Sequence, residues 1–401
     1  MSFHSMWAQL RPIGRSSASG GYRRYAWTGA DADCRAWFAQ QARDRGLAYE
    51  VDRNGNQWAW LGDPALGDAV VTGSHLDSVP DGGAFDGPLG VVSAFAALDE
   101  LRDRGTEFAR PLGVVNFGDE EGARFGLACV GSRLTAGRLT AEEAHRLTDA
   151  DGVTLPRAME AAGYDPEAIG PDPGRLARIG AFVELHVEQG RALDLSGDAV
   201  GVASAIWPHG RWRFDFRGEA NHAGTTRLDD RRDPMLPYAE TVLAARREAR
   251  LAGALATFGK VAVEPNGVNA VPSLVRGWLD SRAADPESLD AVVTGVERAA
   301  RAYAREHGVG LDVVRESFTP VVGFDHALRD ELVRVLGPGT PVLGTGAGHD
   351  AGILSGTVPT AMLFVRNPTG VSHSPAEHAT EDDCAAGVTA LADALEGLVR
   401  G

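Results

Sequence analysis

The distribution of apolar and polar residues predicts helices alternating with strands over the first part of the chain. Apolar residues recur with helical spacing in ADCRAWFAQQARDRG, and AYEVDRNGNQWAWLG indicates a hairpin that turns at Asn54-Gly55. The segments DAVVTGSH, RPLGVVNFGDEEG and AFVELHVEQG predict strands, and GVVSAFAALDELRDRG predicts a helix that ends at Gly105. This alternation is typical of a layered α/β fold.

A different order of elements follows a polar, proline-punctuated helical region at 124–180. From RWRFDFRGEA onward, the pattern predicts strand, helix, two strands, helix and strand over about 211–321. This β-α-β-β-α-β order is a recurring compact unit. The α/β alternation then returns, with GTGAGHDAGILSG expected as a loop and a last helix ending at Val399. We therefore expect a main domain formed by 1–210 and 322–401, with a second domain, 211–321, inserted in it.

Composition narrows the classes of function. The chain has 401 residues, 44% hydrophobic and 23% charged, which is ordinary for a globular protein. Its net charge of −16 argues against nucleic acid as a partner. Apolar stretches fall far short of the roughly 20 residues that cross a bilayer, and MSFHSMWAQLRPIGR lacks the apolar segment of a secretory signal. Three widely spaced cysteines suit a reducing compartment, so we expect a cytoplasmic protein without membrane partners.

Imidazoles and carboxylates gather where the predicted strands end. The segment GSHLDSVPDGGAFDGPLG, from Gly73 to Gly90, joins a strand to a helix, and ligands in open α/β sheets bind beyond the carboxyl ends of the strands. The residues expected to converge there are His75, Asp77, Asp86, Glu120, Glu121, His186 and His373.

Such a mixture of side chains suits Zn²⁺ or a similar first-row ion. One carboxylate can bridge two ions, and a neighbouring carboxylate can act as a general base. Because adjacent residues on an extended segment point opposite ways, Glu120 and Glu121 can divide the roles of base and ligand. Asp77 can hold the second nitrogen of His75. Each feature alone also has a structural explanation, such as a turn or a solvated edge, but their joint occurrence at strand ends favours a metal site.

The motifs resemble those of a known enzyme superfamily. HLDSVP with a downstream Asp, followed by DEEG, resembles the pattern of dinuclear-metal amidohydrolases of the aminopeptidase/acylase superfamily. ELHVEQG, GEANHAGTT, GAGHDA and SHSPAEHA resemble a narrower group that hydrolyses ureido compounds: allantoate amidohydrolases, N-carbamoyl-L-amino acid hydrolases and β-ureidopropionases. The resemblance covers nearly the whole chain. It implies a zinc-aminopeptidase-like catalytic domain with a mixed sheet, and an inserted lid and dimerisation domain.

The resemblance also implies roles for individual residues. Glu120 matches the general base, and His222 matches a residue that reaches a neighbouring subunit's site and steadies the oxyanion. Asp86 matches a bridging ligand of two divalent ions, Zn²⁺ or Mn²⁺ with Co²⁺ as a further option. The complete set of matching metal ligands is His75, Asp86, Glu121, His186 and His373. The matching substrate-binding positions are Gln189, His222, Asn269, Arg282 and Gly348. A homodimer with shared active sites follows from the role of His222.

The expected activity is metal-dependent cleavage of the carbamoyl C–N bond of a ureido acid. Allantoate, a substrate of purine catabolism, is slightly favoured over an N-carbamoyl-L-amino acid because the pocket-facing segments are polar. The alternatives are a peptidase or N-acyl amino acid deacylase, against which His186 argues, and a non-catalytic binding protein, against which the complete ligand set argues. HAGTTRLDDRRDP and AIWPHGRW depart from the family pattern, which leaves open whether Trp207, His209 and Arg227 alter the substrate pocket or only shape its rim.

Overall fold

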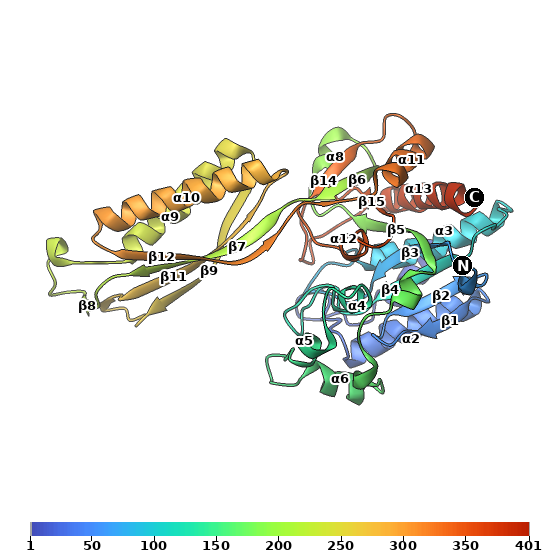
Figure 1. Ribbon diagram of the computed structural model, residues 1–401, viewed down its shortest axis with the longest axis horizontal. Helices are drawn as coiled ribbons and strands as arrows, with labels where there is room; N and C mark the ends of the chain where they lie inside the picture. The colour runs from blue at the N-terminus through green and yellow to red at the C-terminus, as the bar shows by residue number, and fades with distance from the viewer. Residues whose placement is uncertain (1, 401) are drawn as a thin grey trace. The chain divides into compact units, whose positions relative to one another are not determined.

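The computed structural model describes residues 2–400, which form two compact units (Figure 1). Unit 1 runs to Ser204 and resumes at Gly323, and unit 2 is Ala205–Val322. The predicted boundary at 210 falls inside strand β7, and residues 1 and 401 of the predicted main domain lie outside the described part. Among the described residues, no helix is both long and apolar enough to cross a membrane.

Unit 1 is built on a mixed sheet of nine strands, which confirms the predicted fold class. Its order is β1-β2-β4-β3-β5-β15-β6-β13, with β14 paired to β6. β4, β3, β5 and β15 run parallel, whereas β2 and β6 flank them antiparallel. β3, β4 and β15 are buried along their whole length because helices cover both faces of the sheet. The strands are β1 (Ala48–Val51), β2 (Gln57–Leu61), β3 (Ala69–His75), β4 (Leu112–Phe117), β5 (Ile179–Val187), β6 (Val200–Ile206), β13 (Val322–Gly323), β14 (Val342–Thr345) and β15 (Thr360–Val365).

The main core of unit 1 joins one face of this sheet to a layer of helices. Residues of the sheet such as Val183 and Leu363 share one hydrophobic cluster with α1 (Phe3–Leu10), α2 (Gly29–Asp44), α3 (Pro88–Asp103), α11 (His326–Leu336) and α13 (Glu381–Val399). A smaller cluster is formed by the segment between β4 and β5. The remaining helices are η1 (Pro64–Leu66), α4 (Val130–Thr135), α5 (Ala141–His145), α6 (Leu155–Ala161), η2 (Pro166–Ala168), α7 (Pro173–Leu176), α8 (Ala192–Ser196) and α12 (Asp350–Leu354).

Several elements of unit 1 depart from the sequence interpretation. The expected loop GTGAGHDAGILSG contains the end of β14 and all of α12, and neither α1 nor β6 was predicted. All are short, and β6 (VGVASAI) carries small residues in place of an alternating pattern. α1 is fixed by tertiary packing, since its buried Met6 and Leu10 belong to the main core.

Unit 2 has the predicted β-α-β-β-α-β order. Its antiparallel sheet runs β12-β7-β11-β9, and a two-stranded ladder joins β8 to β10. Both long helices pack on one side of the four-stranded sheet, where Phe214, Leu279 and Val296 belong to the core (Figure 1). The elements are β7 (His209–Arg217), β8 (Asn221–His222), η3 (Leu228–Asp230), α9 (Met235–Ala252), β9 (Leu255–Glu264), β10 (Ala270–Val271), β11 (Leu274–Arg282), α10 (Pro286–Glu306) and β12 (Gly310–Thr319).

The turn of the β1-β2 hairpin gives a test of this packing. Gly55 has φ +85°, and a Cβ on it would lie 2.3 Å from Cη2 of the Trp27 ring. Gly46 has φ +64° with no atom within 4 Å of such a Cβ. Gly46→Ala should lower the free energy of unfolding by about 1 kcal/mol through backbone strain. Gly55→Ala should cost ~2 kcal/mol more because it also overpacks the site. Urea unfolding followed by circular dichroism measures both variants, and equal losses would contradict the steric account.

Candidate metal centre

The glycines between β3 and α3 allow large side chains to approach the backbone. Gly87 has φ +81°, and a Cβ on it would lie 2.4 Å from Cε1 of His75. A Cβ on Gly83 would lie 2.3 Å from Oε1 of Glu377. The loop therefore holds Asp86 close to the end of β3 only because these two positions lack side chains.

Asp86 lies at the centre of the cluster. Its Oδ1 is 3.1 Å from Nε2 of His186 and 3.7 Å from Nε2 of His75. Its Oδ2 is 3.5 Å from Nε2 of His373, on the loop after β15. Asp86 belongs to two groups with the spacing of metal ligands, His75-Asp86-His186 and Asp86-Glu121-His373, and a third such group, Glu184-His186-His349, does not include it. The two oxygens of Asp86 thus face different groups, as expected for a bridging carboxylate.

Backbone carbonyls set the tautomers of the two buried imidazoles. Nδ1 of His186 is 2.9 Å from the carbonyl oxygen of Val187, and Nδ1 of His75 is 3.2 Å from that of Asp77. Because a carbonyl oxygen only accepts, each neutral ring carries its proton on Nδ1 and presents a lone pair at Nε2. Neither Nε2 has a hydrogen-bond partner among residues 2–400. Lone pairs directed at a carboxylate fit a cation bound between them.

Glu120 and Glu121 face different parts of the cluster, as their adjacency predicted. Oε2 of Glu120 is 3.7 Å from Nε2 of His75, whereas Oε2 of Glu121 is 3.6 Å from Nε2 of His373. The buried carboxylate of Asp77 accepts hydrogen bonds from both backbone N–H groups, at 3.1 Å for Glu120 and 3.0 Å for Glu121. Its Oδ1 also lies 3.4 Å from Nδ1 of His75. Asp77 therefore positions the imidazole and the paired glutamates together.

The concentration of buried carboxylates changes their protonation. Burial, with the charge of Asp86 as the next cause, raises the pKa of Glu121 to about 8. Burial also raises the pKa of Glu120 well above its ordinary value, against the opposing effect of His75. Burial would raise the pKa of Asp86 as well, but His186 and His75 in their protonated forms outweigh it, the first through a hydrogen bond and its charge, and lower this pKa. A cation bound here would stabilise the charged forms of both glutamates.

Sequence reasoning missed several residues of this region. The thiol of Cys129 donates a hydrogen bond of 3.2 Å to Oε1 of Glu120. Oε1 of Glu377 accepts hydrogen bonds from the backbone N–H groups of Phe85, at 2.9 Å, and Asp86, at 3.0 Å. The ring of His349 lies 4.5 Å from that of His186, measured between centroids. Glu377 lies within the motif SHSPAEHA and His349 within GAGHDA, so these motifs could have pointed to both residues. Nothing in the sequence pattern indicated Cys129.

Two of the predicted substrate-binding residues lie in unit 1. Nε2 of Gln189 donates hydrogen bonds to Oδ2 of Asp86, at 2.9 Å, and to Oγ of Ser372, at 3.1 Å. Gly348 is exposed just before His349. Gln189 therefore belongs to the cluster itself.

The other predicted substrate residues lie in unit 2. His222 and Asn269 come together on the β8-β10 ladder, where Ala223 N–H donates to the Asn269 carbonyl at 2.9 Å. Nδ1 of His222 accepts a hydrogen bond of 2.9 Å from the backbone N–H of Gly224. Arg282 is the last residue of β11. Its Nε and Nη2 donate hydrogen bonds of 2.8 Å and 3.1 Å to the Asp280 carboxylate, and these bonds orient the planar guanidinium group.

The residues that depart from the family pattern lie partly beside this arginine. His209 is the cross-strand partner of Arg282 in the β7-β11 ladder, and its Nδ1 is 3.0 Å from the carbonyl oxygen of Trp207. Burial lowers the pKa of His209. Arg227 is exposed. Its Nη2 is 4.0 Å from Oδ2 of Asp229, and its Nε is 3.9 Å from Oδ2 of Asp230. His209 is therefore placed next to a predicted substrate residue.

Known proteins resemble this chain over nearly its whole length. Residues 71–397 match the model of peptidase family M20/M25/M40. The N-carbamoyl-L-amino acid amidohydrolase of Geobacillus stearothermophilus is 36% identical over 99% of this chain and 98% of its own. The allantoate amidohydrolase of Escherichia coli K12 is 33% identical over 93% of this chain and 92% of its own. The crystal structure of an amidase of the hydantoinase/carbamoylase family from Burkholderia multivorans superposes with a TM-score of 0.89, at 31% identity, over 100% of this chain and 97% of that one.

The double role of Asp77 yields a prediction about metal affinity. Asp77→Asn keeps the shape of the side chain but replaces one carboxylate oxygen with an NH₂ group. That group faces the backbone N–H of Glu120 or Glu121, which then has no acceptor. Affinity for Zn²⁺ should fall by about 10- to 100-fold, the usual loss when a group that orients ligands is removed. Competition with a chromophoric chelator measures it, with the exposed Asp103→Asn as the matched control. An unchanged affinity for Asp77→Asn would show that Asp77 does not support the ligands.

Proposed function

The chain belongs to peptidase family M20/M25/M40, and from this membership and the cluster around Asp86 we propose that it is a metal-dependent amidohydrolase that cleaves the carbamoyl C–N bond of a ureido acid. The observation that carries the proposal is the pair of ligand groups that share Asp86, with Glu120 beside them. Relatives named allantoate amidohydrolase and N-carbamoyl-L-amino acid amidohydrolase support the ureido substrate.

The residues present fit two divalent ions. His75, Asp86 and His186 would hold one, and Asp86, Glu121 and His373 the other. Imidazole and carboxylate ligands suit Zn²⁺ and Mn²⁺, with Co²⁺ as a further option. When bound, such ions polarise a carbonyl group and lower the pKa of a water molecule.

Glu120 is the proposed general base. Its Oε2 faces the cluster near His75, and its Oε1 is held by the thiol of Cys129. Glu120 takes a proton from the water that attacks the ureido carbonyl carbon and gives it to the amine nitrogen as the C–N bond breaks. The carbamate released then decomposes to CO₂ and ammonia.

Residues of unit 2 are proposed to hold the substrate. Because Nδ1 of His222 accepts a hydrogen bond from Gly224, its neutral ring carries the proton on Nε2 and can donate it to an oxyanion. The planar fork of Arg282, orientated by Asp280, suits a substrate carboxylate, and Asn269 lies beside His222. We propose that His222 acts in the site of a second copy, which makes the enzyme a homodimer.

A substrate panel tests this function. Metal-loaded protein should release ammonia from allantoate or from N-carbamoyl-L-amino acids, and the protein treated with a chelator should not. Dipeptides and N-acetyl amino acids serve as the comparison, because they probe the peptidase and deacylase alternative. Turnover confined to that comparison set, or full activity in metal-free protein, would contradict the proposal.

The division of roles between the paired glutamates gives a second test. Glu120→Gln removes the base but leaves the ligands, so turnover should fall by about 10²-fold or more while metal stays bound. Glu121→Gln, its matched neighbour, should lose metal instead. Metal analysis after gel filtration, together with ammonia release, measures both variants. The reverse pattern would exchange the two assignments.

A further inference from the structure

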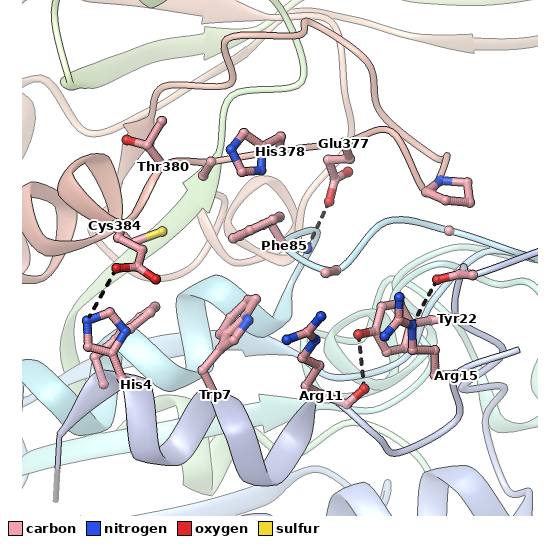
Figure 2. Close-up of a pocket in the computed structure, with 17 residues that line it drawn as sticks. His4, Trp7, Arg11, Arg15, Tyr22, Phe85, Glu377, His378, Thr380 and Cys384 are labelled. Carbon is pink, nitrogen blue, oxygen red and sulfur yellow. Dashed lines mark hydrogen bonds and ion pairs between the residues drawn. The ribbon is translucent and has the colours of Figure 1, made fainter. Parts of the chain in front are cut away.

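Unit 1 contains a cavity outside the candidate metal centre. It has a volume of about 500 Å³ and lies between α1, the loop at 82–85 and the segment at 375–384 (Figure 2). None of the proposed metal ligands lines it. Its size is within the range of pockets that hold small molecules.

Stacked aromatic rings form one side of the cavity. The rings of Phe3 and Trp7 stack at 5.5 Å between centroids and 13° between planes, and those of Trp7 and Phe85 at 5.0 Å and 26°. All three are only partly buried, so part of this aromatic surface remains accessible. The edge of His378 meets Phe85 from the opposite side at 5.9 Å (Figure 2). A flat apolar group can pack against such rings.

Two arginines and two glutamates line the cavity. Of the glutamates, Glu377 accepts hydrogen bonds from backbone N–H groups, and Oε2 of Glu381 lies 4.0 Å from Nε2 of His4. Arg11 and Arg15 line it, and Figure 2 shows them on the same side as Trp7 and Tyr22. The side chain of Arg11 has no hydrogen-bond or ion-pair partner among residues 2–400, and Arg15 makes only a 3.2 Å hydrogen bond from Nε to the Gly20 carbonyl. Both arginines are exposed and have no acidic partner among the described residues, so their guanidinium groups can bind an anion that enters the cavity.

The cavity wall is continuous with the loop that carries Asp86. Phe85 contributes its ring to the cavity, and its backbone N–H, like that of Asp86, donates to Oε1 of Glu377. Glu377 is buried in the wall, and Figure 2 shows its carboxylate directed to the backbone of Phe85. A molecule packed on Phe85 therefore touches the residue next to the proposed bridging ligand.

From these contacts we infer that the cavity is a second ligand site, which binds a small organic carboxylate with a flat apolar body. The carboxylate binds to Arg11 and Arg15, whose guanidinium groups match its two oxygens. The apolar body packs against the exposed parts of the Trp7 and Phe85 rings that their stacking partners leave uncovered. This site goes beyond the proposed hydrolysis and does not depend on it.

Phenylacetate is a suitable probe because it joins one ring to one carboxylate and has no ureido group. A ligand-observed NMR titration of the metal-loaded protein should show saturable binding. The double variant Arg11→Gln, Arg15→Gln should weaken it by about tenfold or more, since charge-assisted hydrogen bonds are lost. Arg43→Gln, an exposed arginine of α2 that pairs with no carboxylate, is the matched control and should leave the affinity unchanged. The neutral analogue 2-phenylethanol should bind the native protein at least about tenfold more weakly.

A second variant separates this site from the proposed substrate site. Arg282→Gln removes the arginine assigned to the substrate carboxylate, so binding that survives in it and fails in the double variant supports the inference. The inference would be overturned if phenylacetate binding were lost in Arg282→Gln and retained in the double variant. It would also be overturned if the native protein did not bind phenylacetate. Equal displacement of the probe by inorganic phosphate and by benzoate would overturn the assignment to organic carboxylates. All of these experiments measure binding and none measures turnover. Their results can therefore be interpreted even if the protein does not hydrolyse ureido acids.

Discussion

Negative charge buried at the carboxyl ends of β3, β4 and β5 is the constraint on which the other features of unit 1 depend. Two unit charges 4 Å apart repel by about 4 kcal/mol at an effective dielectric constant of 20, so several carboxylates can share a buried site only if each is compensated. Asp77 is compensated by two backbone N–H groups, and Asp86 by imidazoles. Burial raises the pKa of both glutamates of the pair, and a bound cation would stabilise their charged forms.

The same constraint explains why backbone groups, rather than side chains alone, surround the cluster. The Val187 carbonyl fixes the proton on His186, and Phe85 and Asp86 donate their N–H groups to Glu377. Backbone partners are set by strand and loop geometry, so the ligand atoms are orientated before any ion arrives. Such preorganisation keeps the entropic cost of assembling a metal site low.

Regular periodicity made most of the fold predictable. The buried strands and long amphipathic helices were located from local pattern, and the residues at their ends followed from the rule that parallel strands end at one edge. Elements fixed by distant contacts were not predictable: α1 is held by the main core, and α12 follows a glycine-rich segment with no periodic signal. The hydrogen bonds of Cys129 and Glu377 were also not predictable, because each depends on a loop conformation that the sequence pattern does not encode.

The chain leaves unit 1 through β6 and returns in β13, and these strands are neighbours in the large sheet. At this point the N–H of Phe324 donates to the Ser204 carbonyl at 3.2 Å, so the two ends of the insertion meet. The entropic cost of closing a loop grows only slowly with its length, so a long insertion at this point costs the sheet little. A change confined to the insertion can therefore alter the proposed substrate residues of unit 2 while leaving the cluster around Asp86 in unit 1 in place.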